Sequence, residues 1–286
     1  MDSVKLVGIN GRYTHSCLAL FYLRNELEKY YPECSIELLQ LTINDNYFES
    51  LLHLSSGNPR YIFFSAAIWN SDLVEKLCRD LAICLPSCRV IIGGPQASVL
   101  SQQLDTNNSS VVLGAIEAVG EQFYRDLKTG DVARKYEAHS FNVESRTFSY
   151  PYKDTDFASY LANRHIYYES SRGCMFGCSY CLSSVEKGVY RKPLNVVKEE
   201  LKNILSHNPQ IVRYIDRTYN DLPDRALAIW EFLLDEGGET LFHFEMAPER
   251  FTEKMFEFLQ QVGPGKFQFE IGIQSTNSAT LEAVNR

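Results

Sequence analysis

Three cysteines lie close together in the second half of the chain, in the segment Ser171-Arg-Gly-Cys174-Met-Phe-Gly-Cys178-Ser-Tyr-Cys181. The spacing Cys-x3-Cys-x2-Cys puts three thiolates within eight residues, and Gly173 and Gly177 relax the backbone around them. Iron–sulfur clusters are ordinarily held by four cysteines. Three cysteines therefore predict a 4Fe–4S cluster with one iron left open for a small molecule, which is a catalytic arrangement rather than an electron-transfer arrangement.

A structural zinc site is the alternative for this loop. Zinc held by three cysteines would need a fourth Cys or His ligand. His165 lies nine residues before Cys174, on the far side of an expected strand, and is poorly placed to serve. The loop directly follows that strand, at the end where barrel enzymes build their active sites. We therefore expect Cys174, Cys178 and Cys181 to be the ligands of a cluster.

The chain has eight cysteines in 286 residues, too few for a dense disulfide framework. In a reducing cytosol they should be thiols or metal ligands. The five outside the loop are scattered, and we expect them to be small buried or incidental residues: Cys17, Cys34, Cys78, Cys84 and Cys88.

Composition and charge exclude several classes of protein. Apolar residues make up 45% of the chain, so a sizeable core is available. The net charge is −8, so the bulk charge does not suggest a surface that tracks phosphates, and we do not expect a nucleic-acid partner. The sequence has no apolar run of 18 residues, and its first ten residues lack the layout of a signal peptide. We expect a cytoplasmic protein without a membrane partner.

The first half alternates apolar strand segments with helical segments. Apolar runs predict strands at 5–10, 35–42, 61–68, 89–95 and 110–114, with helices at 15–31, 47–54, 71–85 and 120–128. Runs that are continuously apolar indicate a parallel sheet covered on both faces. We expect an α/β fold in which residues 1–128 form a flavodoxin-like or Rossmann-like domain. Its ligand crevice should lie beyond the carboxyl ends of the strands.

The second half repeats a strand followed by a helix. Strands are expected at 166–170, 211–216, 241–245 and 266–275. Four β/α units in succession over residues 165–286 indicate a TIM-type barrel. Four strands cannot close such a barrel, and the sequence stops at Arg286 within an expected helix, so we expect a partial barrel and the N-terminal fragment of a longer protein. Residues 129–164 mix polar and aromatic residues with poor periodicity and are expected to be a linker.

The cysteine loop resembles that of the radical S-adenosylmethionine (radical SAM) superfamily. The resemblance rests on Cys174-x3-Cys178-x-Tyr180-Cys181, with an aromatic residue just before the third cysteine. It implies that S-adenosylmethionine binds the open iron through its amino and carboxylate groups. Reductive cleavage then yields a 5′-deoxyadenosyl radical that removes hydrogen from a substrate. The electron would come from a partner such as flavodoxin or ferredoxin.

The resemblance also implies cofactor contacts at the ends of the strands. Tyr180 should lie against the adenine, and Gln274 and Ser275 should contact the ribose or the carboxylate. Asp216 stands where the superfamily often has a Gly-Gly-Glu motif, which is absent here. For each lone carboxylate, a solvated or salt-bridged role is the alternative. The full set expected around S-adenosylmethionine is Tyr180, Asp216, Asn220, Glu245, Glu270, Gln274 and Ser275. The sequence singles out no catalytic side chain.

The first domain resembles the cobalamin-binding domain that precedes the radical core in one large subgroup, of which this chain looks like an uncharacterised branch. The segments 9–16, 91–98 and 111–121 carry the resemblance. The Asp-x-His-x-x-Gly loop of many cobalamin proteins is missing, because Tyr13 stands where the Asp would precede His15. His15 could ligate cobalt, contact the corrin edge or cap a helix. The expected cobalamin contacts are Asn10, His15, Gly93, Gly94, Pro95, Gln96 and Glu121. A flavodoxin-like domain without a ligand is the alternative.

Together these features predict a cobalamin-dependent radical SAM enzyme. It would transfer a methyl group, or form or rearrange a ring, on a small-molecule substrate. Two alternatives remain open. One is a radical SAM enzyme whose first domain is only a docking module, and the other is a non-catalytic metal-binding interaction protein. Modification of tRNA is a further option that the acidic composition disfavours.

Overall fold

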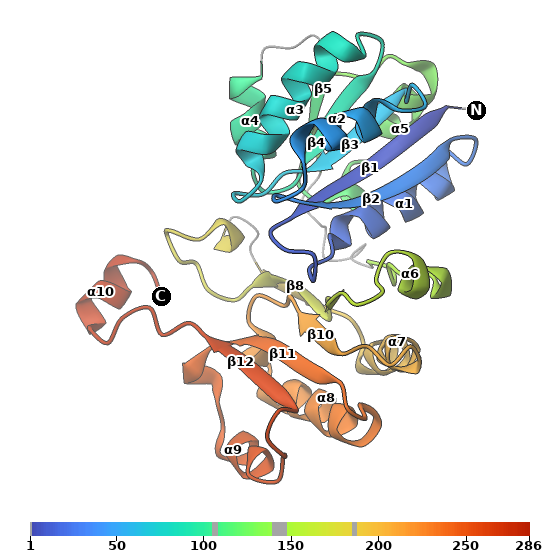
Figure 1. Ribbon diagram of the computed structural model, residues 1–286. Coiled ribbons are helices and arrows are strands. Elements are labelled where there is room, and N and C mark those ends of the chain that lie inside the picture. The colour runs from blue at the N-terminus through green and yellow to red at the C-terminus, as the bar shows by residue number, and fades with distance from the viewer. Residues whose placement is uncertain (1, 105–107, 139–147, 185–187) are drawn as a thin grey trace. The chain divides into compact units, whose positions relative to one another are not determined.

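The computed structural model describes residues 2–104, 108–138, 148–184 and 188–286. The chain forms two compact units, Met1–Ala162 and Asn163–Arg286. They are called unit 1 and unit 2 (Figure 1). None of the helices in the described residues is long and apolar enough to cross a membrane.

Unit 1 is built on one six-stranded sheet in which all neighbouring strands are parallel. The strands are β1 (Ser3–Asn10), β2 (Ser35–Thr42), β3 (Tyr61–Ser65), β4 (Arg89–Gly93), β5 (Ser109–Leu113) and β6 (Lys135–Glu137). They lie in the order β2-β1-β3-β4-β5-β6. The order of the first five strands is that of flavodoxin-like sheets, which confirms the fold expected for the first domain.

Helices cover both faces of this sheet (Figure 1). They are α1 (Leu18–Tyr30), α2 (Tyr47–Ser55), α3 (Ser71–Cys84), α4 (Ala97–Gln103) and α5 (Glu121–Thr129), with a one-turn helix η1 (Ile116–Ala118). Leu54, Leu77 and Leu100 from α2, α3 and α4 share one core with Ile62 and Ile92 of the strands. On the other face, α5 contacts β3 through an edge-to-face pair of Phe63 and Phe123, and α1 contacts α5 through stacked Tyr30 and Tyr124. Because both faces are buried, the strands are apolar throughout.

The described residues of 129–162 belong to unit 1. Strand β6 extends the sheet beside β5, and α6 (Asp154–Ser159) lies against α1. A buried ion pair joins them, with Arg24 Nη1 2.5 Å from Asp156 Oδ1. Residues 139–147 of the expected linker lie outside the described part of the chain.

Unit 2 contains a parallel sheet of four strands in the order β12-β11-β10-β7. The strands are β7 (Ile166–Tyr168), β10 (Ile211–Tyr214), β11 (Leu241–Met246) and β12 (Phe267–Ile271). The helices are α7 (Leu194–Ser206), α8 (Pro223–Glu236), α9 (Glu253–Leu259) and α10 (Ser278–Ala283), with one-turn helices η2 (Leu182–Ser184), η3 (Tyr219–Asp221) and η4 (Pro248–Arg250). Neighbouring strands follow one another in sequence with helices between them. This is the incomplete β/α barrel that the sequence predicts.

An aromatic core fixes the face of this sheet that meets the helices. Trp230 of α8 is completely buried. Its ring lies 6.0 Å from that of Phe244 and 5.4 Å from that of Phe269. Because side chains alternate along a strand, His243 and Glu245 of β11 must point to the opposite face. That opposite, inner face carries the polar residues of unit 2.

Candidate functional site

The first cysteine of the loop belongs to a short strand. β8 (Ser171–Cys174) pairs antiparallel with β9 (Gly188–Arg191). Gly173 has φ +88°, and a Cβ there would lie 2.1 Å from the carbonyl oxygen of Gly188. Only glycine therefore fits at this position, and the close approach of the two backbones directs the chain from β8 into the cysteine loop.

A buried carboxylate joins the start of this loop to the end of β10. Asp216 Oδ1 accepts a hydrogen bond from the backbone N–H of Ser170 at 2.7 Å. Its Oδ2 accepts bonds from the hydroxyls of Ser170 at 2.5 Å and of Ser171 at 2.9 Å. Two residues further along, the Thr218 hydroxyl lies 3.5 Å from the Cys174 sulfur. Burial raises the pKa of Asp216 to about 6, against the lowering effect of the three donors.

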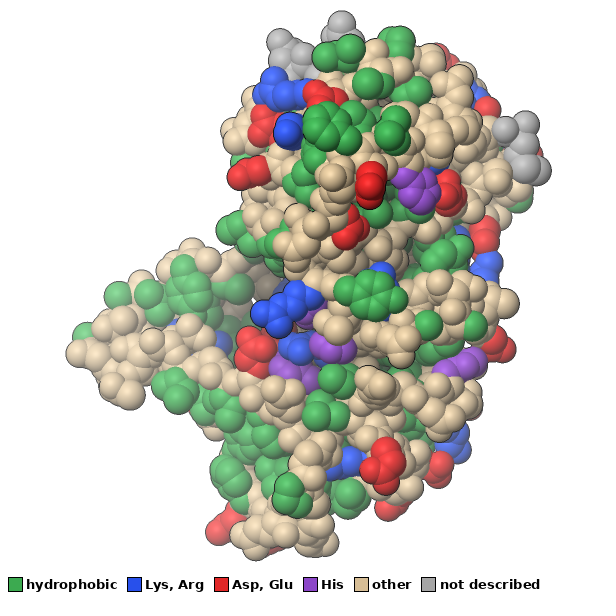
Figure 2. Space-filling view, viewed as in Figure 1, with side chains coloured by type: hydrophobic (Ala, Val, Ile, Leu, Met, Phe, Trp, Pro, Cys, Tyr) green, Lys and Arg blue, Asp and Glu red, His purple; other side chains and the backbone are tan. Residues whose placement is uncertain are grey.

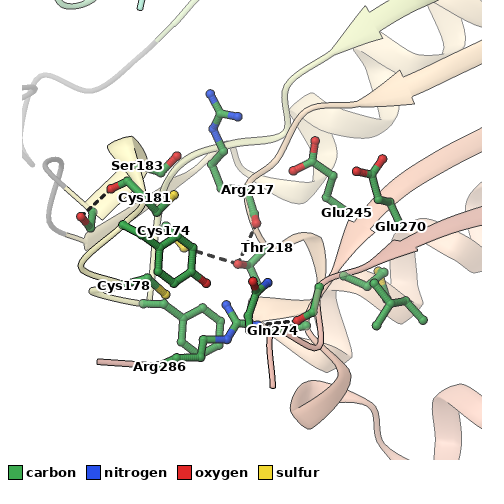
Figure 3. Close-up of a pocket in the computed structure, with 17 residues that line it drawn as sticks. Cys174, Cys178, Cys181, Ser183, Arg217, Thr218, Glu245, Glu270, Gln274 and Arg286 are labelled. Atoms are coloured by element: carbon green, nitrogen blue, oxygen red, sulfur yellow. Dashed lines mark hydrogen bonds between the residues drawn. The ribbon is translucent and has the colours of Figure 1, made fainter. Parts of the chain in front are cut away.

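The three cysteines line one cavity of about 330 Å³. Cys178 is buried, and Cys174 and Cys181 are half-buried. Figure 3 shows the cysteines on one side, Glu245 and Glu270 at the ends of their strands on the other, and Arg217 and Thr218 between them. Of the residues predicted from the sequence, the cavity brings together Cys174, Cys178, Tyr180, Cys181, Glu245, Glu270 and Gln274.

The donors that the cysteine loop offers to a metal centre are three thiols. In the described part of the chain, no three Cys, His, Asp or Glu side chains converge closely enough to hold one metal ion. The thiolates of a tetrahedral zinc site lie roughly 3.8 Å apart, because each Zn–S bond is about 2.3 Å long. The thiolates of a cuboidal cluster bind different irons and therefore stand further apart. The three thiols of this loop supply the ligands that a cluster with one open iron needs.

Three predicted residues do not line the cavity. The carboxylate of Asp216 already accepts hydrogen bonds from Ser170 and Ser171. Asn220 is completely buried and exchanges two hydrogen bonds with the backbone of Ala247, which fixes the turn after β11. The hydroxyl of Ser275 accepts a hydrogen bond from the backbone N–H of Asn277. Asp216 and Asn220 therefore support the walls of the cavity from behind.

Two lining residues, Thr218 and Ser183, were not singled out from the sequence, whereas Arg217 was expected to be a structural residue or a partner of the cofactor's carboxylate. Thr218 and Arg217 follow Asp216 in the loop after β10, and Ser183 follows the third cysteine. Their place just beyond a strand end or a cysteine is the signal that could have found them. Gln274 is unusual in having φ +65° without being glycine. Strained backbone of this kind gathers at functional sites, which supports its selection.

The inner face of the sheet carries opposite charges beside the cavity. Burial raises the pKa of Glu245, Arg217 opposes that effect and Glu270 adds to it. Glu270 Oε2 lies 3.3 Å from His243 Nε2. Burial, reinforced by Arg213, lowers the pKa of His243. The cavity wall therefore carries charged groups at the ends of β11 and β12, where an ordinary barrel interior would be packed with branched apolar residues.

The carboxyl edge of the sheet in unit 1 collects the other predicted site. In a sheet of this order, ligands bind at the carboxyl edge beside β1 and β3, because the connections that follow these two strands run to opposite faces of the sheet. Asn10 ends β1 and donates a hydrogen bond to Gln40 Oε1 at 2.9 Å. His15 lies half-buried in the loop between β1 and α1. Gly93 ends β4, and Gly94 has φ +93°.

The remaining predicted residues of this edge lie on the segments that follow β4 and β5. Pro95 comes after the two glycines, and Gln96 is the residue that precedes α4. Glu121 is the first residue of α5, exposed and paired with Arg125 one helical turn later. The edge also presents two large apolar side chains, Ile68 (78% exposed) and Trp69 (60% exposed), in a segment that the sequence placed at the crevice.

The comparisons with known proteins agree with this geometry. Residues 168–286 match the radical SAM superfamily. Unit 2 therefore contains a radical SAM domain. No curated protein matches the chain.

The matches to solved structures extend over the residues of both units. The cobalamin-dependent S-adenosylmethionine radical enzyme OxsB matches with a TM-score of 0.75 and 16% identity, over 100% of this chain and 45% of that one. The radical S-adenosylmethionine methyltransferase TsrM from Kitasatospora setae, with cobalamin and a [4Fe–4S] cluster bound, matches with a TM-score of 0.73 and 16% identity, over 98% of this chain and 60% of that one. TsrM with tryptophan and an S-adenosylmethionine analogue matches with a TM-score of 0.72 and 16% identity, over 98% of this chain and 61% of that one. The chain thus has the fold of these enzymes and spans about half of their length.

Proposed function

We propose that this chain is the cofactor-binding part of a radical SAM enzyme, and that Cys174, Cys178 and Cys181 hold a 4Fe–4S cluster with an open iron for S-adenosylmethionine. The observation that carries the proposal is that three thiols of one loop and the polar ends of β11 and β12 line the same cavity. When bound, the reduced cluster supplies the electron that cleaves S-adenosylmethionine to a 5′-deoxyadenosyl radical.

The chain's own residues would orient S-adenosylmethionine and limit the access of water. The ring of Tyr180, 56% exposed beside two of the cysteines, offers a flat surface for the adenine. Gln274 at the turn after β12 lines the cavity and offers a polar group to the ribose or the carboxylate. Arg217, exposed at the cavity, offers a cation to the ligand's carboxylate.

We further propose that unit 1 binds cobalamin at the carboxyl edge of its sheet. The supporting features are the flavodoxin-like order, the Gly93-Gly94 turn and the exposed apolar side chains beside the point where β1 and β3 diverge. Cobalamin would supply methyl transfer or ring chemistry on a small-molecule substrate. Flavodoxin or ferredoxin would supply electrons. The expected division is a cobalamin domain at 1–128, a connecting segment at 129–164 and the radical core at 165–286.

Anaerobic reconstitution with iron and sulfide tests the cluster. We expect about four irons per chain, a brown chromophore, and 5′-deoxyadenosine after addition of S-adenosylmethionine and dithionite. The triple variant Cys174→Ala/Cys178→Ala/Cys181→Ala should lose all three signals. Cys84→Ala, which changes an exposed cysteine of α3, should keep them. Zinc binding without colour would contradict the proposal and favour a non-catalytic metal protein.

Reconstitution with hydroxocobalamin tests the role of unit 1. Corrin absorption bands that stay with the protein through gel filtration are the expected result. If no corrin is retained while the cluster and the 5′-deoxyadenosine are formed, unit 1 is a docking module and the radical SAM assignment stands alone.

A further inference from the structure

Two carboxyl groups lie side by side on the wall of the cavity. Glu245 of β11 and Glu270 of β12 are register partners on neighbouring parallel strands. Strands in such a pair lie about 4.8 Å apart, and register partners point to the same face. Figure 3 shows both side chains at the strand ends on the cavity side. Burial raises the pKa of Glu245, and the neighbouring charge of Glu270 adds to that effect.

Glu270 has charged and polar partners on the same face. Its Oε2 lies 3.3 Å from His243 Nε2 and 4.0 Å from Arg213 Nη2. Arg213 Nη2 lies 3.2 Å from the same His243 nitrogen. His243 is buried, whereas the Glu270 side chain is 69% exposed, so only the imidazole side of this contact is shielded from water. On the face shown in Figure 2, side chains of Lys or Arg, Asp or Glu and His lie together over unit 2.

Glu245 is placed differently. The described contacts give it no hydrogen bond and no ion pair. The charged groups that act on it are Arg217 and Arg213, which attract it, and Glu270 and Asp216, which repel it. Burial also disfavours its ionised form. Glu270 has a cation beside it and Glu245 has none within contact, so a proton is better placed on Glu245.

We propose that Arg213 is a positioning residue that places a positive charge beside Glu270, so that Glu245 carries a proton before the ligand binds and releases it when a sulfonium cation enters. The step balances as one carboxylic acid plus one cationic ligand giving a carboxylate beside the cation and one proton in solution. This inference rests on the proposed binding of S-adenosylmethionine. It adds to that proposal that Glu245 responds to the permanent positive charge of the ligand.

The sulfonium charge provides a matched pair of ligands for the test. S-adenosylhomocysteine has the same adenosine, amino and carboxylate groups but a neutral sulfur. The proton that an α-ammonium group loses on binding iron is common to both ligands. The difference between their proton release therefore isolates the response to the sulfonium charge.

The experiment is isothermal titration calorimetry on the reconstituted full chain, in buffers of different ionisation enthalpy across roughly pH 5 to 8. The wild type should release up to about one proton more with S-adenosylmethionine than with S-adenosylhomocysteine. Its affinity ratio for the two ligands should rise with pH, by up to about tenfold per pH unit below the pKa of Glu245. Both effects should disappear in Glu245→Gln.

Further variants test the positioning role. Glu270→Gln removes the neighbouring charge, so the release by Glu245 should move to lower pH. Arg213→Met removes the cation beside Glu270, so the proton should be shared between Glu245 and Glu270. In that background, Glu245→Gln should no longer abolish the difference in proton release between the two ligands. Gln268→Ala is the matched control, because Gln268 is the register partner of His243 and does not line the cavity. It should release protons as the wild type does.

A difference between the two ligands that persists in Glu245→Gln overturns the inference and leaves the radical SAM proposal intact. An equal release with both ligands in the wild type also overturns it. Failure of the wild type to bind S-adenosylmethionine at all overturns the proposed function and this inference with it.

Discussion

The carboxylate of Asp216 accepts the backbone N–H of Ser170 at 2.7 Å, and this bond joins the end of β10 to the residue that precedes β8. The same carboxylate takes the hydroxyls of Ser170 and Ser171. One buried side chain therefore sets where the strand that carries Cys174 begins. The cysteine loop is positioned by a group that touches none of the cysteines.

The first prediction concerns this anchor. Asp216→Asn replaces an acceptor of three hydrogen bonds by an amide whose NH₂ faces donors, so at least one buried donor loses its partner. We expect the free energy of unfolding to fall by about 1–3 kcal/mol at neutral pH, and iron incorporation to fall with it. Urea denaturation measures the first and iron content the second. Asp235→Asn, on the exposed face of α8, is the control. Equal stability of the two variants would contradict the anchoring role.

The second prediction is a pH dependence. Burial raises the pKa of Asp216 from 3.8 to about 6, so between these values the folded chain binds more protons than the unfolded chain. Stability from this group is therefore present at low pH and is lost as pH rises through about 6. The shift of about two units corresponds to at most about 3 kcal/mol. The difference in free energy of unfolding between wild type and Asp216→Asn should therefore narrow as the pH rises from 3.8 to about 6. A constant difference would show that Asp216 does not titrate there.

The role of Asp216 as an anchor for two serines could not be predicted from the sequence. The strand pattern was sufficient for both sheets except β6, and the cysteine spacing was sufficient to find a loop that lines the cavity. A carboxylate at a strand end, however, looks the same in the sequence whether it faces a ligand or the backbone of a loop. The expected strand 166–170 is in fact β7 followed by the anchored Ser170, because the bond to Asp216 interrupts the sheet there.

Short polar elements escaped prediction for a related reason. Strand β6 reads Lys-Tyr-Glu and owes its conformation to hydrogen bonding with β5, which a local pattern cannot reveal. Helix α4 spans only seven residues with few apolar ones and is held by Ala97 and Leu100 against the sheet. In both cases tertiary contacts override weak local preference.

The third prediction separates two adjacent glycines in unit 1. Gly94 has φ +93°, and a Cβ there would lie 2.4 Å from the Ala66 carbonyl oxygen. Gly94→Ala should therefore destabilise the unit by about 2 kcal/mol or more. A Cβ at Gly93 would meet nothing closer than 4.0 Å, so Gly93→Ala should fold normally. If the corrin approaches this turn, Gly93→Ala should still weaken cobalamin retention. Thermal unfolding and corrin absorbance report the two effects separately.

The fourth prediction concerns Trp69. Its ring is 60% exposed at the end of β3, while its Nε1 donates to the carbonyl of Ile9 at 3.3 Å. An indole held in this way offers a ready apolar surface to a corrin. Trp69→Ala should change thermal stability by less than about 1 kcal/mol but lower cobalamin retention severalfold. Ile83→Ala removes an even more exposed apolar residue (79%), on α3, and should leave retention unchanged. Equal retention in both variants would remove Trp69 from the proposed site.

The last prediction returns to the two glycines of the cysteine loop, which the sequence treats alike and the structure does not. A Cβ at Gly173 would lie 2.1 Å from the backbone oxygen of Gly188, so Gly173→Ala must separate β8 from β9. A Cβ at Gly177 would meet only the amide nitrogen of the Asn285 side chain, which can turn away. We expect Gly173→Ala to incorporate less than about half of the wild-type iron, because Cys174 moves with β8. Gly177→Ala should incorporate nearly all of it. Equal iron content would mean that the loop assembles around the cluster without the β8–β9 pair.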